Sequence, residues 1–266
     1  MINSRNGDAI ILNMKKICIF GSDRRMGYLC SLFLDAGYST EHLQSISEDE
    51  TTKAEIFIFP VGVEEATIKK YIDSNEGSLF FVGNSNISGE NVFDYFKDEV
   101  VTIKNTIPTA EGTIATAIAE TEETLFGSRC LVLGYGKVGK TLAGYLGCFG
   151  AKVTIAARKE RDRVLASINS FDTIDITSLE RKVADYDIII NTIPVKIIDA
   201  SILKNIRSGS TIIDLASKPG GVDFKEAKAL GKKVIWALGL PAKVAPKTAA
   251  LYIFEYILGI IKERNK

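Results

Sequence analysis

The sequence predicts an α/β fold of two doubly wound parallel-sheet domains. After Lys16, short runs rich in β-branched and aromatic residues alternate with helical patterns, as in parallel strands joined by crossover helices. Runs such as DIIINTIP are almost continuously apolar, which is typical of strands covered on both faces. The two halves also repeat the order of strand, glycine turn and helix, and Gly21 lies as far from Gly37 as Gly134 lies from Gly150.

The strands are predicted from runs of β-branched and aromatic residues. In the first half they are Ile17–Phe20, Ile56–Phe59, Leu79–Val82 and Val100–Ile103. In the second half they are Cys130–Leu133, Lys152–Ala156, Ile188–Asn191, Thr211–Asp214 and Val234–Ala237.

Two helices are predicted outside the repeated units. One follows Pro108, with Thr109 as its N-cap and Gly127 as its C-cap, and connects the two domains. The other spans about Pro246 to Lys262, and its wide apolar face should pack back on the first domain. This helix contains the most apolar window, AALYIFEYILGII, which has 13 residues and includes Glu255. A membrane span needs about 20 residues, so a buried helix is expected.

Composition excludes several classes of function. The chain has 266 residues with 33 basic and 33 acidic side chains, so net charge gives no reason to expect nucleic acid or a membrane surface as a partner. The four cysteines are too dispersed for a zinc site and too few for a disulfide scaffold, so reduced thiols, no metal and a cytoplasmic protein are expected. The sole histidine, His42, lies in a polar segment and is expected in solvent rather than in catalysis.

The glycines of the second half predict a dinucleotide site. Gly134, Gly136 and Gly139 follow a strand and open a helix, which is the context this motif needs. Gly134 permits the turn, Gly136 lets the backbone approach a pyrophosphate, and Gly139 lets the helix pack on the strand. The first half has Asp23 opposite Gly136, and a carboxylate there would oppose a pyrophosphate. We therefore expect the cofactor in the second domain, on Gly134, Tyr135, Gly136, Lys137, Val138, Gly139, Arg158, Lys159, Asn191, Thr192 and Pro194.

The end of the strand after the glycine turn bears on the type of cofactor. An acid at this point usually accepts a hydrogen bond from the ribose of NAD, but the chain has Arg158 and Lys159 there. A guanidinium pairs with a 2′-phosphate, which favours NADP. NAD stays open, because some NAD enzymes also carry a base here, and RKERDR could be a solvated charged turn.

The domains follow from these assignments. The first domain reuses the scaffold without the cofactor motif and is expected to bind the substrate. The predicted parts are residues 1–13 (an extension outside the fold), 14–108 (substrate domain), 109–127 (connecting helix), 128–243 (a Rossmann domain for NADP) and 244–266 (the helix returning to the first domain).

Polar stretches at strand ends predict a substrate cleft, because the carboxyl ends of strands line the crevice of an open α/β sheet. The stretches are NTIPTAEGT, NTIP, DLASKPGGVDF and GLPAKVAPKTAA. They supply Asn105, Thr109, Glu111, Lys218 and Lys247, which suit a small carboxylated substrate. Asn105, Thr109, Lys218 and Lys247 are the substrate-binding candidates, and Lys247, Lys218 and Glu111 the catalytic ones. Each of these residues could instead serve only as a cap or turn.

The chain resembles the dipicolinate synthase A-subunit family from about Lys16 to its end. The resemblance rests on NTIPTAEGTI, VLGYGKVGKT, AAR, INTIP, DLASKPGGVDF and GLPAKVAPKTA. It implies a fold like that of two-domain NAD(P)-dependent dehydrogenases. It also implies oxidation of dihydrodipicolinate, a small dicarboxylate, to dipicolinate with the flavoprotein-like B-subunit of the synthase, in the mother cell of a sporulating bacterium. A homo-oligomer is possible. GSDRRMG matches the family only loosely, which leaves any role of Arg24 or Arg25 open.

Two other functions remain open. The first is an NADP-dependent dehydrogenase of another small acid, of the shikimate or 2-hydroxyacid type. The second is a non-catalytic, NADP-binding regulatory subunit whose partner carries out the chemistry. Hydride transfer by this chain would exclude the regulatory role.

Overall fold

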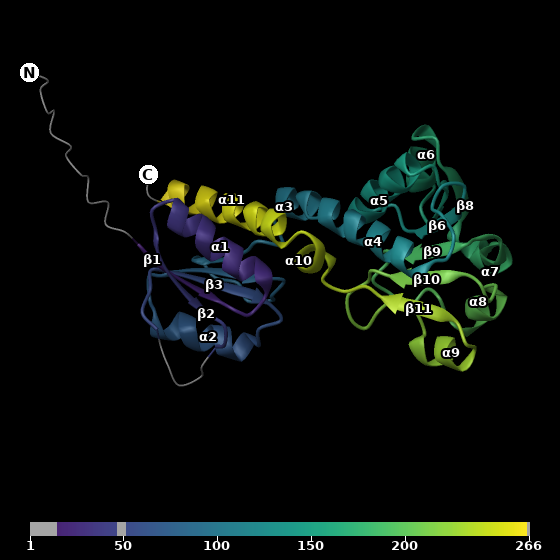
Figure 1. The fold of residues 1–266 in the computed structure, drawn as a ribbon. Helices are drawn as coiled ribbons and strands as arrows, with labels where there is room; N and C mark the ends of the chain where they lie inside the picture. Colours follow the sequence, from purple (N-terminus) through teal and green to yellow (C-terminus); the bar gives the residue numbers. More distant parts are fainter. Residues whose placement is uncertain (1–14, 47–51, 265–266) are drawn as a thin grey trace, which may run out of the picture. The chain divides into compact units, whose positions relative to one another are not determined.

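The computed structural model describes residues 15–46 and 52–264, and the extension expected over residues 1–13 lies outside them. The chain divides into two compact units (Figure 1). The first unit holds the described residues up to Val101 together with those from Pro246 onward, and the second holds Thr102–Ala245.

The first unit is built on a five-stranded parallel sheet of order β2-β1-β3-β4-β5. Its strands are β1 (Lys16–Phe20), β2 (Ser39–Leu43), β3 (Ile56–Val61), β4 (Leu79–Gly83) and β5 (Val92–Asp94). Its helices are α1 (Arg24–Asp35), α2 (Glu65–Ser74) and α11 (Pro246–Arg264). The short α3 (Glu99–Lys104) runs from this unit into the next.

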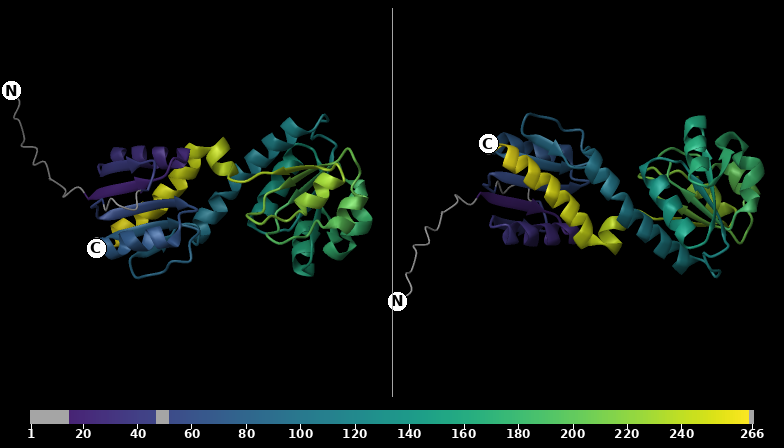
Figure 2. Two further views of the ribbon diagram at one scale, coloured as in Figure 1. Left: turned by 90° about the horizontal axis from the view of Figure 1, so that it is seen from below. Right: turned by 90° about the horizontal axis from the view of Figure 1, so that it is seen from above.

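Helices cover both faces of this sheet. The inward residues of α1 and α11 share one core with alternate residues of the strands, among them Ile19, Phe33 and Ile257. The remaining strand residues, such as Phe57, pack with Tyr71 of α2 on the opposite face. Figure 2 shows α11 running along the layer that contains α1. The prediction that the C-terminal helix packs on the first domain is confirmed.

The second unit has a six-stranded parallel sheet of order β11-β10-β9-β6-β7-β8. Its strands are β6 (Arg129–Leu133), β7 (Lys152–Ala157), β8 (Asp172–Asp175), β9 (Ile188–Asn191), β10 (Thr211–Asp214) and β11 (Lys233–Trp236). Its α-helices are α4 (Thr106–Glu120), α5 (Lys137–Cys148), α6 (Glu160–Ile168), α7 (Leu179–Lys182), α8 (Ala200–Asn205), α9 (Phe224–Ala229) and α10 (Leu240–Val244), and two 3₁₀ turns are η1 (Ile176–Ser178) and η2 (Val183–Asp185). The predicted pair of doubly wound domains is confirmed.

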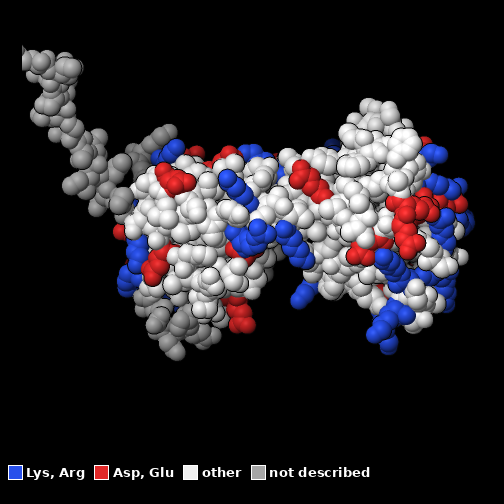
Figure 3. Space-filling model, viewed as in Figure 1, with Lys and Arg blue, Asp and Glu red and all other residues white. Residues whose placement is uncertain are grey.

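The two faces of this second sheet have separate cores. Helices α4, α5 and α10 pack on one face, through residues such as Ile114, Leu142 and Leu240. Helices α7, α8 and α9 pack on the other face, through residues such as Leu179 and Leu203. On the face in Figure 3, acidic and basic side chains are interspersed over both units.

One predicted strand is wrong, and three strands were not predicted. Val100–Ile103 forms part of α3, because Asp98 Oδ1 accepts a hydrogen bond from Val101 N at 2.8 Å and so caps a helical turn. Strands β2, β5 and β8 are edge strands of their sheets. An edge strand need not be apolar along its length, so short polar segments such as STEHL and DTID escape a search for apolar runs.

The helix predicted over residues 109–127 differs at both ends. It begins at Thr106, because Pro108 is tolerated in a first turn, where its missing N–H is not needed. Thr109 therefore lies inside the helix, where its Oγ1 donates to the Asn105 carbonyl at 2.8 Å. The helix ends at Glu120, since Thr121 is extended. Its buried residues belong to the core of the second unit, so α4 is part of that unit rather than a connector.

His42 is half-buried rather than solvated. Its Nε2 lies 2.8 Å from the Gly21 carbonyl oxygen, so the imidazole ties β2 to the turn after β1. All four cysteines are free, and Cys18 and Cys130 are buried in β1 and β6. No helix in the described part of the chain has the length and apolar character needed to cross a lipid bilayer.

Candidate functional site

The glycine turn after β6 has the geometry that the sequence predicts. Gly134 has a φ of 95°, in the left-handed region that favours glycine. A Cβ on Gly139 would collide with the Gly134 carbonyl, so only glycine lets α5 start this close to the strand. Gly136 is the N-cap of α5 and provides no side-chain cap. The first N–H groups of α5 thus stay available to an anion.

A cavity of about 670 Å³ opens at this turn, within the second unit. Its walls come from the glycine turn, the end of β7, the start of α6, η1 and the loop after β9. It is lined by Gly134, Tyr135, Gly136, Lys137, Val138, Ala157, Arg158, Lys159, Asp162, Ile176, Thr192, Ile193, Pro194, Val195 and Ile197. The predicted cofactor residues therefore line one cavity, with the exception of Gly139 and Asn191.

Asn191 shapes the cavity from behind instead of lining it. Its side chain is fully buried, and its Nδ2 donates to Asp214 Oδ1 at 2.8 Å and to the Ile193 carbonyl at 3.0 Å. These bonds fix the loop that carries Thr192 and Pro194. Thr192 Oγ1 in turn donates to the Leu133 carbonyl at 2.8 Å, so the loop is also attached to the end of β6.

Asp214 organises the loop after β10. It is fully buried, and besides Asn191 it accepts hydrogen bonds from Ala216 N at 3.1 Å and Gly221 N at 2.7 Å. The DLASKPGG stretch is therefore held by its own first residue. Lys218 lies exposed in this loop, just before a cis peptide bond to Pro219.

Two predicted cofactor residues have structural contacts of their own. The ring of Tyr135 belongs to the core below α5, and its hydroxyl accepts a hydrogen bond from Asn169 Nδ2 at 3.2 Å. The Lys137 ammonium donates to Thr102 Oγ1 at 2.8 Å.

The end of the cavity beside β7 carries both signs of charge. Arg158 and Lys159 are exposed there, and neither side chain has a hydrogen bond or ion pair with any residue that the structure describes. Asp162, from the first turn of α6, lines the same wall and was not predicted from the sequence. The helical spacing from Lys159 to Asp162 in RKERDR could have indicated it.

The predicted substrate residues lie in different units. Asn105, Thr109, Glu111 and Lys218 belong to the second unit, with Glu111 exposed on α4. Lys247 belongs to the first unit and is exposed in the first turn of α11, after the buried Pro246. The assembly of these residues into one cleft stays a prediction.

The turn after β1 in the first unit repeats the glycine geometry with a different N-cap. Gly21 has a φ of 106°, but Asp23 caps α1 by accepting from Arg25 N at 2.9 Å. Arg25 Nε also donates to Asp23 Oδ2 at 2.9 Å. Burial disfavours the ionised carboxylate, but the hydrogen bonds from Arg25 outweigh burial, and the pKa of Asp23 is lowered. A carboxylate thus takes the place that is open to an anion at Gly136.

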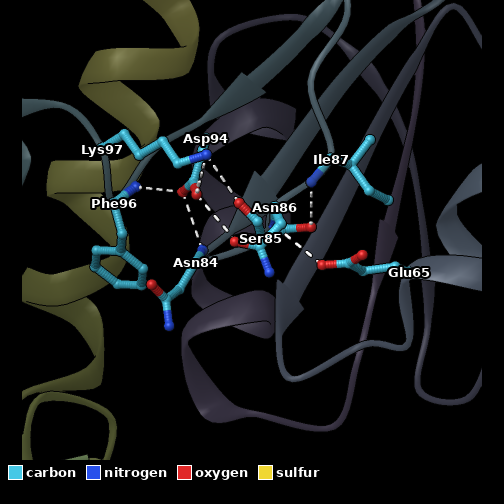
Figure 4. A network of polar contacts seen from close by, with 8 residues as sticks. All are labelled: Glu65, Asn84, Ser85, Asn86, Ile87, Asp94, Phe96 and Lys97. Atoms are coloured by element: carbon cyan, nitrogen blue, oxygen red, sulfur yellow. Dashed lines mark hydrogen bonds and ion pairs between the residues drawn. The ribbon is translucent and has the colours of Figure 1, made fainter.

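The first unit also uses an aspartate at a strand end to hold a loop (Figure 4). Asp94, at the end of β5, is buried and accepts hydrogen bonds from the backbone N–H groups of Asn84, Ser85 and Phe96 at 2.9–3.0 Å. Lys97 joins the network by donating to the Ser85 carbonyl at 2.9 Å. Asp94 therefore does for the loop after β4 what Asp214 does for the loop after β10.

The fold and the cavity define a dehydrogenase-like chain with a Rossmann domain for a nicotinamide dinucleotide. Residues 106–236 match the family described as S-adenosyl-L-homocysteine hydrolase, NAD binding domain. The chain is 37% identical over 212 residues to the dipicolinate synthase A-subunit of Bacillus subtilis (strain 168), a match that covers 75% of this chain and 71% of the relative. The chain belongs to the dipicolinate synthase A-subunit family.

Solved structures agree with this assignment. The dipicolinate synthase A-subunit from Bacillus halodurans superposes with a TM-score of 0.82 at 27% identity, over 92% of this chain and 97% of that one. The corresponding structure from Bacillus subtilis gives 0.81 at 27% identity, over 97% and 98%. A transhydrogenase from Sinorhizobium meliloti, at 14% identity and a TM-score of 0.70 over 94% of each chain, shares the fold.

Proposed function

We propose that this chain acts as the A-subunit of a dipicolinate synthase. In this proposal it oxidises dihydrodipicolinate to dipicolinate with a nicotinamide dinucleotide, together with a B-subunit, in the mother cell of a sporulating bacterium. The observation that supports it most is the cavity at the glycine turn, in a chain that belongs to this family.

The residues of the cavity fit the cofactor. Gly136 and the free N–H groups at the start of α5 would hold the pyrophosphate, and Thr192 and Pro194 would lie beside the nicotinamide ribose. The open space around Gly136, which has no atom within 4 Å of a Cβ built there, leaves room for a phosphate to approach the backbone. When bound, the cofactor would supply a hydride acceptor.

We further propose that the cofactor is NADP. Arg158 and Lys159 carry two positive charges without protein partners among the described residues, and a 2′-phosphate would pair with them. NAD is the second candidate, because the Asp162 carboxylate lines the same wall and would accept hydrogen bonds from ribose hydroxyls. Titration of both dinucleotides against the wild type and Arg158→Ala separates them. The variant should lose mainly NADP affinity, whereas equal affinities in the wild type would exclude the NADP proposal.

The substrate part of the proposal uses the predicted residues of both units. Lys218 and Lys247 would meet the two carboxylates, with Asn105 and Thr109 as hydrogen-bonding neighbours. Loss of a hydride and a proton turns the dihydropyridine ring into an aromatic one, so the protein mainly has to orient the ring. A base of modest strength suffices, and Glu111 or one of the lysines would serve.

The decisive assay follows dinucleotide reduction with freshly generated dihydrodipicolinate, with and without the B-subunit. Turnover by this chain supports the proposal. Binding of NADP without turnover under either condition would instead indicate the regulatory role. Turnover only with shikimate-type or 2-hydroxy acids would indicate the other dehydrogenase class.

Lys247→Met tests the substrate site. A charge-assisted hydrogen bond to a carboxylate contributes about 1.5–3 kcal/mol, so kcat/KM should fall roughly ten- to hundredfold. Lys262→Met is the matched control, because Lys262 is an exposed lysine on the same helix. A Lys247→Met enzyme with wild-type kcat/KM would reduce this lysine to a helix-start residue.

A further inference from the structure

One guanidinium nitrogen holds the end of the cavity beside β7 together. Arg163 lies in the first turns of α6 and reaches back to the strand before it. Its Nη1 donates to the Ala157 carbonyl at 2.8 Å and to the Arg158 carbonyl at 2.9 Å. The same nitrogen lies 2.8 Å from Asp175 Oδ2. The Arg163 side chain is 23% exposed and that of Asp175 is 41% exposed, so the ion pair is partly exposed and by itself contributes little to stability. Its importance lies in the three acceptors, from two segments, that this one nitrogen contacts.

Asp175 fixes the part of the wall that follows β8. It is the last residue of β8, paired in register with Ala157, and its Oδ1 accepts hydrogen bonds from Thr177 N at 2.9 Å and Thr177 Oγ1 at 2.7 Å. These hydrogen bonds lower the pKa of Asp175, so it is ionised at neutral pH. The next residue, Ile176, lines the cavity.

The pair Arg163 and Asp175 therefore joins the segments that surround the free Arg158 side chain. It connects the carbonyl groups at the end of β7, the first turn of α6 with Asp162, and the start of η1 with Ile176. None of these contacts uses the Arg158 guanidinium. The Arg163–Asp175 pair holds the backbone of Arg158 in place, while the Arg158 side chain stays available to a ligand.

We propose that Arg163 and Asp175 are positioning residues that set the cofactor selectivity of the cavity. They fix the backbone of Arg158 so that its guanidinium, rather than the Asp162 carboxylate, meets the adenosine ribose, and they thereby favour a 2′-phosphate. This inference rests on the proposed function, because it concerns the dinucleotide cavity.

Asp175→Asn distinguishes positioning from simple charge effects. Removal of a negative charge near an anionic ligand should by itself strengthen NADP binding. Loss of the ion pair to Arg163 should instead weaken NADP relative to NAD, while the amide oxygen can still accept from Thr177. We expect the ratio of the NAD dissociation constant to the NADP dissociation constant, measured by titration calorimetry, to fall roughly fivefold or more.

Arg163→Met is the second variant, and Arg161→Met is its matched control. Both remove one positive charge from the first turn of α6, but the Arg161 side chain is exposed and makes no ion pair or hydrogen bond with the described residues. Arg163→Met should lower the ratio of the NAD to the NADP dissociation constant by more than Arg161→Met does. General destabilisation would lower the folded fraction without changing the ratio, and thermal melts give that fraction directly.

The outcomes separate the two proposals. A wild type that binds neither dinucleotide refutes the proposed function. A wild type that prefers NADP, with an unchanged or increased ratio in Asp175→Asn, refutes the positioning role alone. A wild type without preference for NADP removes the selectivity that Arg163 and Asp175 are proposed to set, and so overturns this inference as well.

Discussion

The two units differ in the residue at the start of the helix that follows their first strand, α1 in one unit and α5 in the other. In each, a strand ends in a glycine of positive φ, Gly21 or Gly134, and a twelve-residue helix follows. Asp23 then satisfies the start of α1 with its own carboxylate, whereas Gly136 leaves the start of α5 open. An N–H group at a helix start donates to a side-chain oxygen or to a phosphate oxygen but not to both, so we expect the second unit rather than the first to bind the dinucleotide.

Gly136→Asp should convert the second turn into a copy of the first. The backbone of Gly136 has a φ of −79°, which any residue adopts, and no atom lies within 4 Å of its Cβ position. Aspartate is a favourable N-cap, so thermal stability should stay the same or rise, while dinucleotide binding in a fluorescence titration is lost. Gly136→Asn is the neutral control and should bind more tightly than Gly136→Asp. Normal binding by a folded Gly136→Asp chain would mean that the cofactor lies elsewhere.

At the scale of elements, the packing of α4 decides its place in the fold. Its alanines and threonines leave little bulk on the inner face, and Gly112 allows Leu240 of α10 to approach closely. A Cβ on Gly112 would lie 2.9 Å from the Leu240 Cβ, closer than atoms in a packed core normally come. Small residues on α4 therefore bring this helix into the second unit.

Replacing either of two helical glycines by alanine should change the free energy of unfolding, in opposite directions for the two positions. Gly144 on α5 is exposed, with open space around it, so Gly144→Ala should stabilise the fold by about 0.5–1 kcal/mol through helix propensity. Gly112→Ala gains the same propensity but overpacks against Leu240, which costs about 1–3 kcal/mol, so a net loss is expected. Denaturant titrations measure both. A stabilised Gly112→Ala variant would show that α10 moves aside at little cost.

At the scale of the whole molecule, each unit has hydrophobic cores of its own, which share no residue among those that the structure describes. Each unit buries a cysteine in the first strand of its own sheet, Cys18 in β1 and Cys130 in β6. Burial raises the pKa of each thiol to about 12, so neither forms a reactive thiolate at neutral pH while its unit is closed. Labelling of these two thiols therefore reports on the opening of each unit.

In a Cys30→Ser/Cys148→Ser background, the dinucleotide should protect Cys130 but not Cys18. A ligand at a hundred times its Kd stabilises the state that binds it by about 2.7 kcal/mol, so labelling of Cys130 should slow about a hundredfold. Mass spectrometry of peptides after timed labelling gives both rates from one sample. Equal protection of the two thiols would show that the units open together, contrary to the separate cores.

Features that depend on local chemistry could be predicted from the chain alone. Near-continuous apolar runs predicted the central strands, and the spacing of Gly134, Gly136 and Gly139 predicted a dinucleotide turn. Gly134 has a positive φ, and a Cβ on Gly139 would collide with the Gly134 carbonyl, so these two positions demand glycine for local steric reasons. Other features depend on contacts between distant segments. In an edge strand such as STEHL no residue is fully buried and the sequence pattern is weak, so its pairing with a neighbouring strand defines it.

Two side chains show why contacts between distant segments cannot be predicted from a local sequence pattern. Asn191 looked like a cofactor ligand from its place at a strand end, but its burial beside Asp214 makes it a support for the loop. Arg163 was one charge among the six of RKERDR until β8 brought Asp175 within 2.8 Å of it. Both roles come from neighbours that are distant in the chain, so folding had to bring those neighbours together before either role existed.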